Sequence, residues 1–134
     1  EGYKKGLENV GLPFDEKDVI FAKANAGKAY TDLENWLRME TIPDAIICAN
    51  DYIAIAVIDR LKVERIAVPD DIAVVGFNDI DLAKFIRPPL TTVKQPLLRI
   101  GKTAAENLIA MIEAKKEAPV QNSLELQLII RESA

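Results

Sequence analysis

Two uninterrupted apolar runs constrain the fold of this chain more than any other feature. Residues 45–49 read AIICA and residues 72–77 read IAVVGF, and neither run alternates polar with apolar side chains. Continuous apolar strands are typical of parallel sheets that helices cover on both faces, because neither face then meets water. The two runs therefore predict strands of a parallel sheet in an α/β domain.

Small polar residues follow both runs. Asn50 and Asp51 come after the first run, and Asn78 and Asp79 end the second stretch. The carboxyl ends of strands in an open parallel sheet form the edge at which ligands bind, so we expect a polar ligand site there. Local roles are the alternative: Asp51 is better placed to cap the following helix than to touch a ligand, and the other three side chains also suit turns.

The remaining segments alternate between helix and strand patterns. Helices are expected at residues 1–10, 27–39, 51–62 and 97–115, with a short helical or irregular segment at 79–86 and further strands at 19–22, 91–95 and 124–130. This alternation predicts right-handed crossovers and a three-layer α/β core with a parallel sheet. The helix at 51–62 is apolar almost all round, which is expected either of ordinary core or of a surface pressed against another subunit.

Composition excludes several function classes. The net charge of -4 gives no basic footprint for nucleic acid, so this chain alone is not expected to bind DNA. There is no histidine and one cysteine, Cys48, which we expect to be buried; imidazole zinc sites, histidine-based triads and disulfide frameworks are thereby excluded. No phosphate-binding glycine motif follows a strand. We therefore expect no enzyme activity, no cofactor and no metal, and the apolar runs are too short for a membrane helix.

Three motifs resemble a known family. PDAIICANDYIAIAVIDRL spans residues 43–61, VPDDIAVVGFNDIDLA spans 68–83 and PPLTTVKQP spans 88–96. With the terminal LIIRES, they resemble the effector domain of the lactose and galactose repressor (LacI/GalR-type) family. The resemblance implies a type I periplasmic-binding-protein-like fold, in which two α/β subdomains enclose a small ligand behind a separate helix-turn-helix headpiece.

The same resemblance implies that the chain is a truncated, carboxyl-terminal part of such a domain. Residues 1–90 would form mainly one subdomain, residues 91–115 a crossing strand and a helix of the other, and residues 116–134 the terminal strand. The DNA-binding headpiece would be absent from this chain. The opening residues fit this expectation, because they begin inside a helical pattern with no cap before it.

The resemblance also implies four ligand contacts. Asn50 matches a family asparagine that bonds ligand hydroxyls, and its amide offers both donors and an acceptor. Asn78 stands where many members have an aspartate, so the stronger charge-assisted hydrogen bond is lost. Asn25 falls near a position where several members stack an aromatic ring on the sugar, which an asparagine does not do. Gln95, on the crossing strand, is the fourth candidate.

The implied function is ligand sensing and dimerisation in a cytoplasmic, bacterial transcriptional repressor. A small sugar or derivative would favour one closure of the subdomains and so shift the population that holds DNA. DNA would be bound only through the headpiece, and no membrane would take part. The homodimer surface would comprise Tyr52, Ile55, Ile58, Asp59, Lys84, Phe85 and Ile86. The alternative is a periplasmic sugar-binding transport receptor of the same fold, which a signal peptide upstream would distinguish.

Overall fold

The computed structural model describes residues 1–21, 25–38, 42–114 and 122–134 of the chain. Helices and strands alternate along these ranges, as the sequence pattern predicts. In chain order the elements are α1 (Gly2–Asn9), the short 3-10 helix η1 (Glu16–Asp18), α2 (Ala26–Trp36), β1 (Ala45–Ile47), α3 (Asp51–Val63), β2 (Ala73–Asn78), the 3-10 helix η2 (Asp81–Lys84), β3 (Thr91–Lys94), α4 (Leu97–Ala114) and β4 (Gln127–Ile129).

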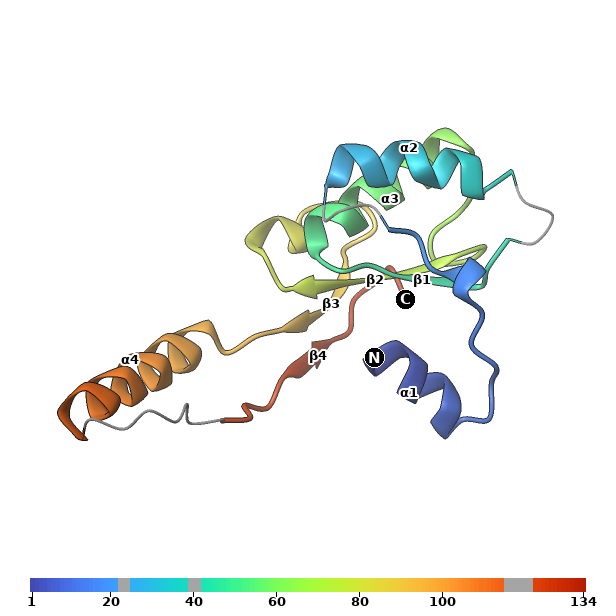
Figure 1. Cartoon of the computed structure of the whole chain (residues 1–134). Coiled ribbons are helices and arrows are strands. Elements are labelled where there is room, and N and C mark those ends of the chain that lie inside the picture. The colour runs from blue at the N-terminus through green and yellow to red at the C-terminus, as the bar shows by residue number, and fades with distance from the viewer. Residues whose placement is uncertain (22–24, 39–41, 115–121) are drawn as a thin grey trace.

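The strands form one sheet in the order β1-β2-β3-β4 (Figure 1). β1, β2 and β3 run parallel, and β4 pairs antiparallel with β3. Val75 of β2 lies beside both Ile47 of β1 and Thr91 of β3. The carboxyl ends of the three parallel strands therefore meet at one edge, and the predicted α/β class with a mainly parallel sheet is confirmed.

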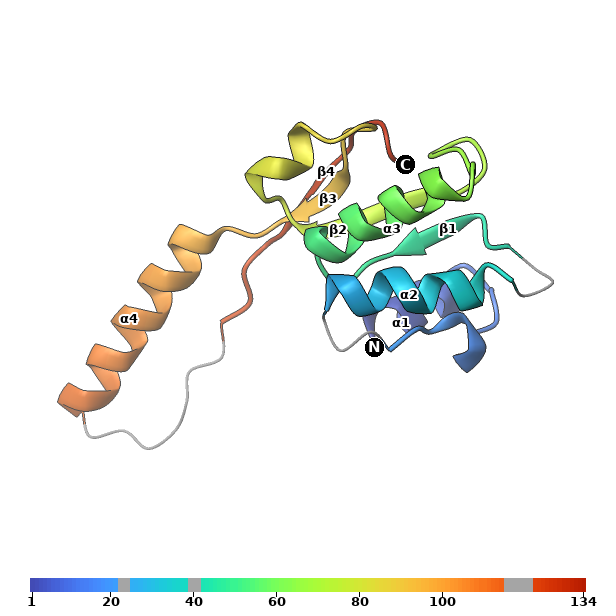
Figure 2. The ribbon, with the colours of Figure 1, turned by 90° about the horizontal axis from the view of Figure 1, so that it is seen from above.

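The core lies between this sheet and two helices. In Figures 1 and 2, α2 and α3 lie on one side of the sheet, and α3 packs directly on β2. The buried apolar residues are Ala29, Leu33, Cys48, Ile53, Ala54, Val57, Ile58, Leu61, Ile72, Val74, Ala83 and Leu90. On the opposite side lies α1, which has no buried residue, and Ile47 of β1 is 66% exposed there. The third layer is thus thin, and β1 is not covered on both faces.

The start of α3 corrects one prediction. Asn50, not Asp51, is the N-cap: its Oδ1 accepts a hydrogen bond from the backbone N–H of Ile53 at 2.9 Å. Basic residues Arg60 and Lys62 in the last turn favour the negative end of the helix dipole. Asp51 is the first helical residue, and its side chain is fully buried. Asn50 takes the capping role because the Asp51 carboxylate is hydrogen-bonded to tertiary partners instead.

Helix α4 projects away from the sheet, as Figures 1 and 2 both show. Its apolar face is exposed: Leu98 is 92% accessible, and Leu97, Leu108 and Ile112 also face solvent. The sequence predicts this helix over 97–115, of which Lys115 lies outside the described residues. No helix among the described residues is both long enough and apolar enough to span a bilayer.

The strand predicted at 19–22 is not found over residues 19–21, and Ala22 lies outside the described part. The 3-10 helix η1 precedes this segment, and Phe21 is exposed. No described strand pairs with it, and an apolar segment without a pairing partner does not become a strand. The predicted terminal strand is also shorter, because only Gln127–Ile129 pairs with β3.

Candidate ligand site

Two of the predicted ligand contacts meet at the carboxyl edge of the sheet. Asn78 ends β2 and Gln95 follows β3, and Gln95 Nε2 donates a hydrogen bond to Asn78 Oδ1 at 2.6 Å. They lie in a solvent-open depression of about 360 Å³. Its walls are formed by Asn78, Asp79, Lys94, Gln95, Pro96, Leu97, Leu98 and Arg99. The parallel register of β2 and β3 places these amides together, because it pairs Asn78 with Lys94.

The turn after β2 is strained, and several contacts hold it. Asn78 and Asp79 have positive φ angles of 118° and 54°, in a region that side chains rarely adopt. Asp79 Oδ1 accepts from Arg131 Nη2 at 2.5 Å, and the backbone N–H of Ile80 donates to Asp51 Oδ2 at 2.8 Å. Strained backbone persists only where the surroundings over-determine it. These contacts therefore hold the Asn78 side chain in a fixed orientation at the end of β2.

Asp51 joins three elements at this edge. Its Oδ2 accepts from Ile80, and its Oδ1 accepts from the hydroxyl of Thr92 in β3 at 2.5 Å. Gly76 of β2 lies directly against it: a Cβ there would be 2.8 Å from Leu90 Cδ2 and closer still to Asp51 Oδ1. A buried carboxylate needs hydrogen-bond donors, and this one receives them from a strand and a turn. Asp51 thus shapes the site without lining it.

The polar network around Asp51 and Asp79 was not predicted from the sequence. It also includes Arg131 and Ser133 near the end of the chain. Arg131 Nη1 donates to the carbonyl of Leu90 at 2.7 Å, while its Nη2 pairs with Asp79. The Ser133 hydroxyl donates to the carbonyl of Val74 at 2.6 Å and accepts from the N–H of Thr91 at 2.8 Å. The usable sequence signal was Gly76, since a lone glycine inside a strand indicates close approach of another group.

The other two predicted contacts are placed differently. Asn50 begins α3 at the same edge, where Asp51 beside it bonds the turn after β2. Its Oδ1 accepts the hydrogen bond of the helix cap, and Asn50 is not among the residues that line the depression. Asn25 caps α2, accepting from the N–H of Lys28 at 3.0 Å. Asn25 is not among the residues that line the depression.

Cys48 is buried, as predicted, and chemically quiet. Burial, and then the negative charge of Asp51, raise the pKa of the Cys48 thiol from its ordinary value of 9.0 to about 12. A thiol that stays protonated at neutral pH is a poor nucleophile and a poor metal ligand. Within the described ranges, no group of three or more acidic or cysteine side chains is arranged to hold a metal ion.

The residues predicted for a dimer surface fall into three groups by burial. Tyr52 and Phe85 are 61% and 72% exposed, and the charged Asp59 and Lys84 are exposed as well. Ile55 is half-buried, and Ile86 packs partly against the core. Ile58 is only 6% exposed and belongs to the core between α3 and the sheet. Its burial removes Ile58 from the candidate surface.

Polar side chains of this α/β unit lie at the carboxyl edge of its parallel strands, the edge at which domains of this architecture bind small molecules. The family model for the periplasmic binding protein-like domain matches residues 1–134. The chain belongs to this family, and the predicted resemblance to LacI/GalR-type effector-binding domains is confirmed by its relatives.

Curated relatives include two proteins described as HTH-type transcriptional repressor PurR. The one from Vibrio campbellii (strain ATCC BAA-1116) is 33% identical over 130 residues, covering 97% of this chain and 39% of that protein. The one from Photobacterium profundum is 34% identical over 133 residues, covering 99% and 40%. This chain therefore spans about 40% of the length of these relatives.

Solved structures of similar proteins share this fold. A transcriptional regulator CelR–cellobiose complex superposes with a TM-score of 0.91 at 31% identity, over 99% of this chain and 41% of that chain. A sugar-binding transcriptional regulator of the LacI family from Escherichia coli, complexed with phosphate, gives 0.86 at 28% identity, over 99% and 48%. All four of these similar proteins are described as transcriptional regulators or repressors.

Proposed function

We propose that this chain is the ligand-sensing and dimerisation part of a transcriptional repressor controlled by a small sugar or a related metabolite. The observation that carries the proposal is the Gln95–Asn78 amide pair at the carboxyl edge, 2.6 Å apart and lining the depression. Amides supply the mixed donors and acceptors that hydroxyl groups require. The family supports the regulatory role, since relatives are named as repressors and one similar structure holds cellobiose.

The proposed mechanism uses the position of Gln95 between two parts of the molecule. β3 ends at Lys94, and Pro96 leads into α4, which projects from the sheet (Figure 1). We assign residues 1–90 mainly to one subdomain, 91–115 to a crossing strand and a helix of the other, and 116–134 to the terminal strand. A ligand that hydrogen-bonds to Asn78 in one subdomain and also contacts the other subdomain favours a single closure angle between the two. Its differential affinity for the two states then shifts the DNA-binding population of the whole protein.

The dimer is proposed to form through Tyr52, Ile55, Asp59, Lys84, Phe85 and Ile86. The Asp51–Ile80 hydrogen bond holds the start of η2 against the start of α3, which brings Tyr52 near η2. Exposed aromatic residues with charged neighbours are typical of interface centres and rims. DNA contact is proposed for a headpiece outside this chain, whose own net charge is -4.

The first experiment is the intact mass and amino-terminal sequence of the natural protein that carries this chain. A helix-turn-helix at its start is the expected result. A cleaved signal peptide would instead assign the same fold to a transport receptor and overturn the regulatory proposal.

Ligand binding is tested by calorimetry on that natural protein, with cellobiose as the first probe and a panel of other mono- and disaccharides after it. For any sugar that binds, Asn78→Ala should weaken affinity by about tenfold or more, as expected for the loss of one well-placed hydrogen bond. Asn9→Ala, at the end of α1, is the matched control and should change nothing. Equal affinity in the Asn78 variant would remove the carboxyl edge as the binding site.

A further inference from the structure

A second cavity lies at the opposite edge of the sheet from the amide pair. It has a volume of about 290 Å³ and is formed by the end of α3, the loop that follows it and the segment just before β3. Three cations, Lys62, Arg65 and Arg87, stand around an apolar floor. The floor comprises Ile58, Ile66, Ala67, Val68 and Pro88.

Positive charge predominates among the residues that line this cavity. No acidic residue in the described part of the chain lines it. Among the residues that the structure describes, none of the three cations forms a salt bridge, whereas Lys28, Arg38 and Arg60 all do. A nearby acid, Asp71, is bound to the backbone N–H of Ala67 at 2.7 Å. Three such cations line one cavity in a chain of net charge -4, which favours an anionic ligand.

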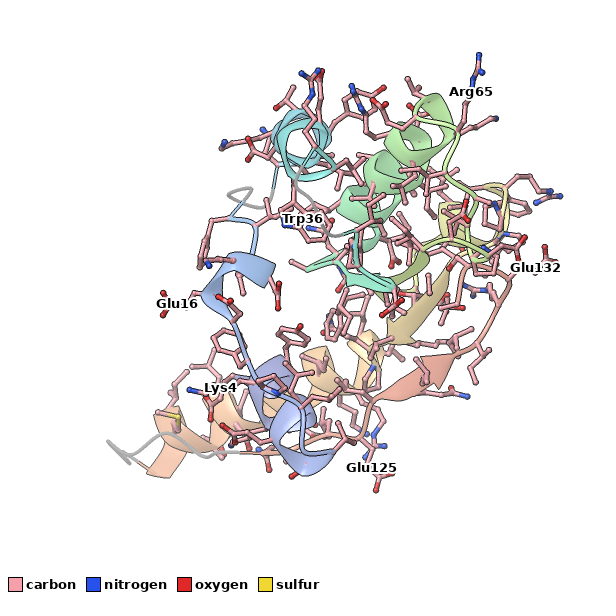
Figure 3. The ribbon with its side chains drawn as sticks, turned by 90° about the vertical axis from the view of Figure 1, so that its right-hand side faces the viewer. Lys4, Glu16, Trp36, Arg65, Glu125 and Glu132 are labelled. Atoms are coloured by element: carbon pink, nitrogen blue, oxygen red, sulfur yellow. The ribbon has the colours of Figure 1, made fainter. Side chains whose placement is uncertain are left out.

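Arg65 occupies a backbone position that normally selects glycine. Its φ angle is 63°, and it closes the end of α3: its N–H donates to the carbonyl of Lys62 at 3.1 Å, and Ile66 donates to Leu61 at 2.9 Å. Glycine is preferred just past a helix end of this kind, because a side chain there is strained. Arg65 lines the cavity from this position, and its side chain extends toward solvent at the end of α3 (Figure 3).

Arg87 is oriented in advance. Its Nη1 donates to the carbonyls of Ile86 at 2.9 Å and Phe85 at 3.3 Å. The guanidinium carries five N–H donors in a fixed fork, so most of them remain available to a ligand. A planar, fixed fork matches the oxygens of a phosphate better than a mobile ammonium does.

We propose that this cavity binds a small phosphomonoester with an apolar body. A phosphate monoester carries close to two negative charges and three acceptor oxygens, which suits a cavity lined by three cations. The apolar floor accounts for the rest of the ligand, and the volume is on the scale of small-molecule sites. The site is separate from the amide pair and does not depend on the sugar-sensing role.

The test uses the natural protein and two probes, phenyl phosphate and inorganic phosphate, titrated by calorimetry at fixed ionic strength with phenol as the uncharged comparison. Both phosphates should bind, phenyl phosphate more tightly, and phenol should not. Binding of phenol alone, or of neither phosphate, would overturn the proposal. Tighter binding of a phosphoserine peptide than of phenyl phosphate would overturn the small-molecule assignment in favour of a phosphorylated protein.

Substitutions of the lining residues test whether phenyl phosphate binds in this cavity. Arg65→Gly should weaken phenyl phosphate binding about tenfold or more, as expected for one charged hydrogen-bond partner, while leaving the fold at least as stable because the strain is relieved. Arg87→Gln should act in the same direction. Lys17→Gln, an exposed cation of η1 that lines neither cavity, is the matched control, and light scattering checks that the oligomeric state is unchanged. Equal losses in Arg65→Gly and Lys17→Gln would show general charge attraction and contradict a built site.

Discussion

At the scale of single residues, Gly76 shows how a missing side chain makes room for a buried carboxylate. A Cβ at this position would lie within 2.8 Å of Leu90 Cδ2 and nearer still to Asp51 Oδ1. We expect Gly76→Ala to lower the free energy of unfolding by about 3 kcal/mol, from overpacking and from displacement of the carboxylate's donors. Urea denaturation of the natural protein measures the loss.

Gly6 of α1 provides the control for that prediction. A Cβ there would meet nothing within 4 Å, and the residue lies inside a helix. Gly6→Ala should therefore be neutral or stabilising by up to about 1 kcal/mol, because alanine is the better helix former. If both alanine variants had the same stability, close approach at Gly76 would not explain why a glycine stands beside Asp51.

Cys48 predicts a specific dependence of stability on alkaline pH. The unfolded thiol ionises near 9.0, whereas the pKa of the native thiol is about 12. Stability from this group is therefore complete below about pH 9 and is lost as the pH rises toward 12, because only the unfolded state releases the proton in that window. The full loss is on the order of 4 kcal/mol for a shift of this size.

The measurement for Cys48 is the free energy of unfolding at pH 8, 9 and 10, for the natural protein and for Cys48→Ala. Lysine and tyrosine titrations are common to both, so the difference isolates the thiol. The natural protein should lose more stability between pH 9 and 10 than the variant. Parallel pH profiles would show that the native thiol is not shielded.

Asn50 and Asp51 show why the sequence predicts a candidate site at the strand ends but does not decide the role of each residue there. Both types cap helices well, so the pattern at 50–51 does not decide between them. What decides is the pair of donors at Thr92 and Ile80, which come from segments distant in the chain. The strand-end position of Asn78 was predictable from the apolar run before it, but its pairing with Gln95 required the register of β2 and β3.

At the scale of elements, Arg131 ties the terminal segment to the turn beside the ligand site. Its ion pair with Asp79 is mostly buried, with 15% and 7% of the two side chains exposed. Arg131→Gln should lower the free energy of unfolding by about 3 kcal/mol, because it leaves Asp79 buried without a counter-charge. Hydrogen exchange should show the accompanying loss of protection in β3, next to β4.

Lys102→Gln is the matched control, since its pair with Glu106 is 3.8 Å long and well exposed. We expect a change within about 0.5 kcal/mol for this surface pair. An Arg131 variant as stable as the Lys102 variant would mean that the terminal segment is held by Ser133 and the β3–β4 ladder alone.

Strands and helices were predictable where a local period decides them. The continuous runs that became β1 and β2 and the helical spacing of α3 and α4 are confirmed. The strand predicted at 19–22 is not formed over 19–21, because a strand needs a neighbouring strand to pair with. The sequence of the run alone does not show whether such a neighbour exists. The thin third layer around α1 likewise depends on packing that the residues of α1 alone do not specify.

At the scale of the whole molecule, we propose different partners for the exposed apolar face of α4 and for the exposed aromatic residues near η2. Leu98 and its neighbours lie on a helix that projects from the sheet, where we place the second subdomain. Tyr52 and Phe85 lie on the main body, where we place the second copy of the chain. The family resemblance predicted that α4 belongs to the other subdomain and that Ile58 belongs to the dimer surface, but Ile58 is buried in the core.

The dimer prediction can therefore be stated on exposed residues only. Phe85→Asp and Tyr52→Asp should each raise the dissociation constant of the dimer by about 100-fold or more, because a charge replaces a large aromatic contact at the interface. Sedimentation of the natural protein at micromolar concentration should then show monomers. Both wild-type side chains are largely exposed in the single chain, so neither substitution should prevent folding.

Leu98→Asp is the control that separates the two surfaces, because Leu98 is 92% exposed and lies on α4. It should leave the dimer intact while loosening the contact proposed for the second subdomain. Ile58→Asp is unsuitable as a test, since it would place a charge in the core and unfold the domain. Dimers that survive Phe85→Asp and Tyr52→Asp but dissociate with Leu98→Asp would reverse the assignment, making α4 the contact between copies.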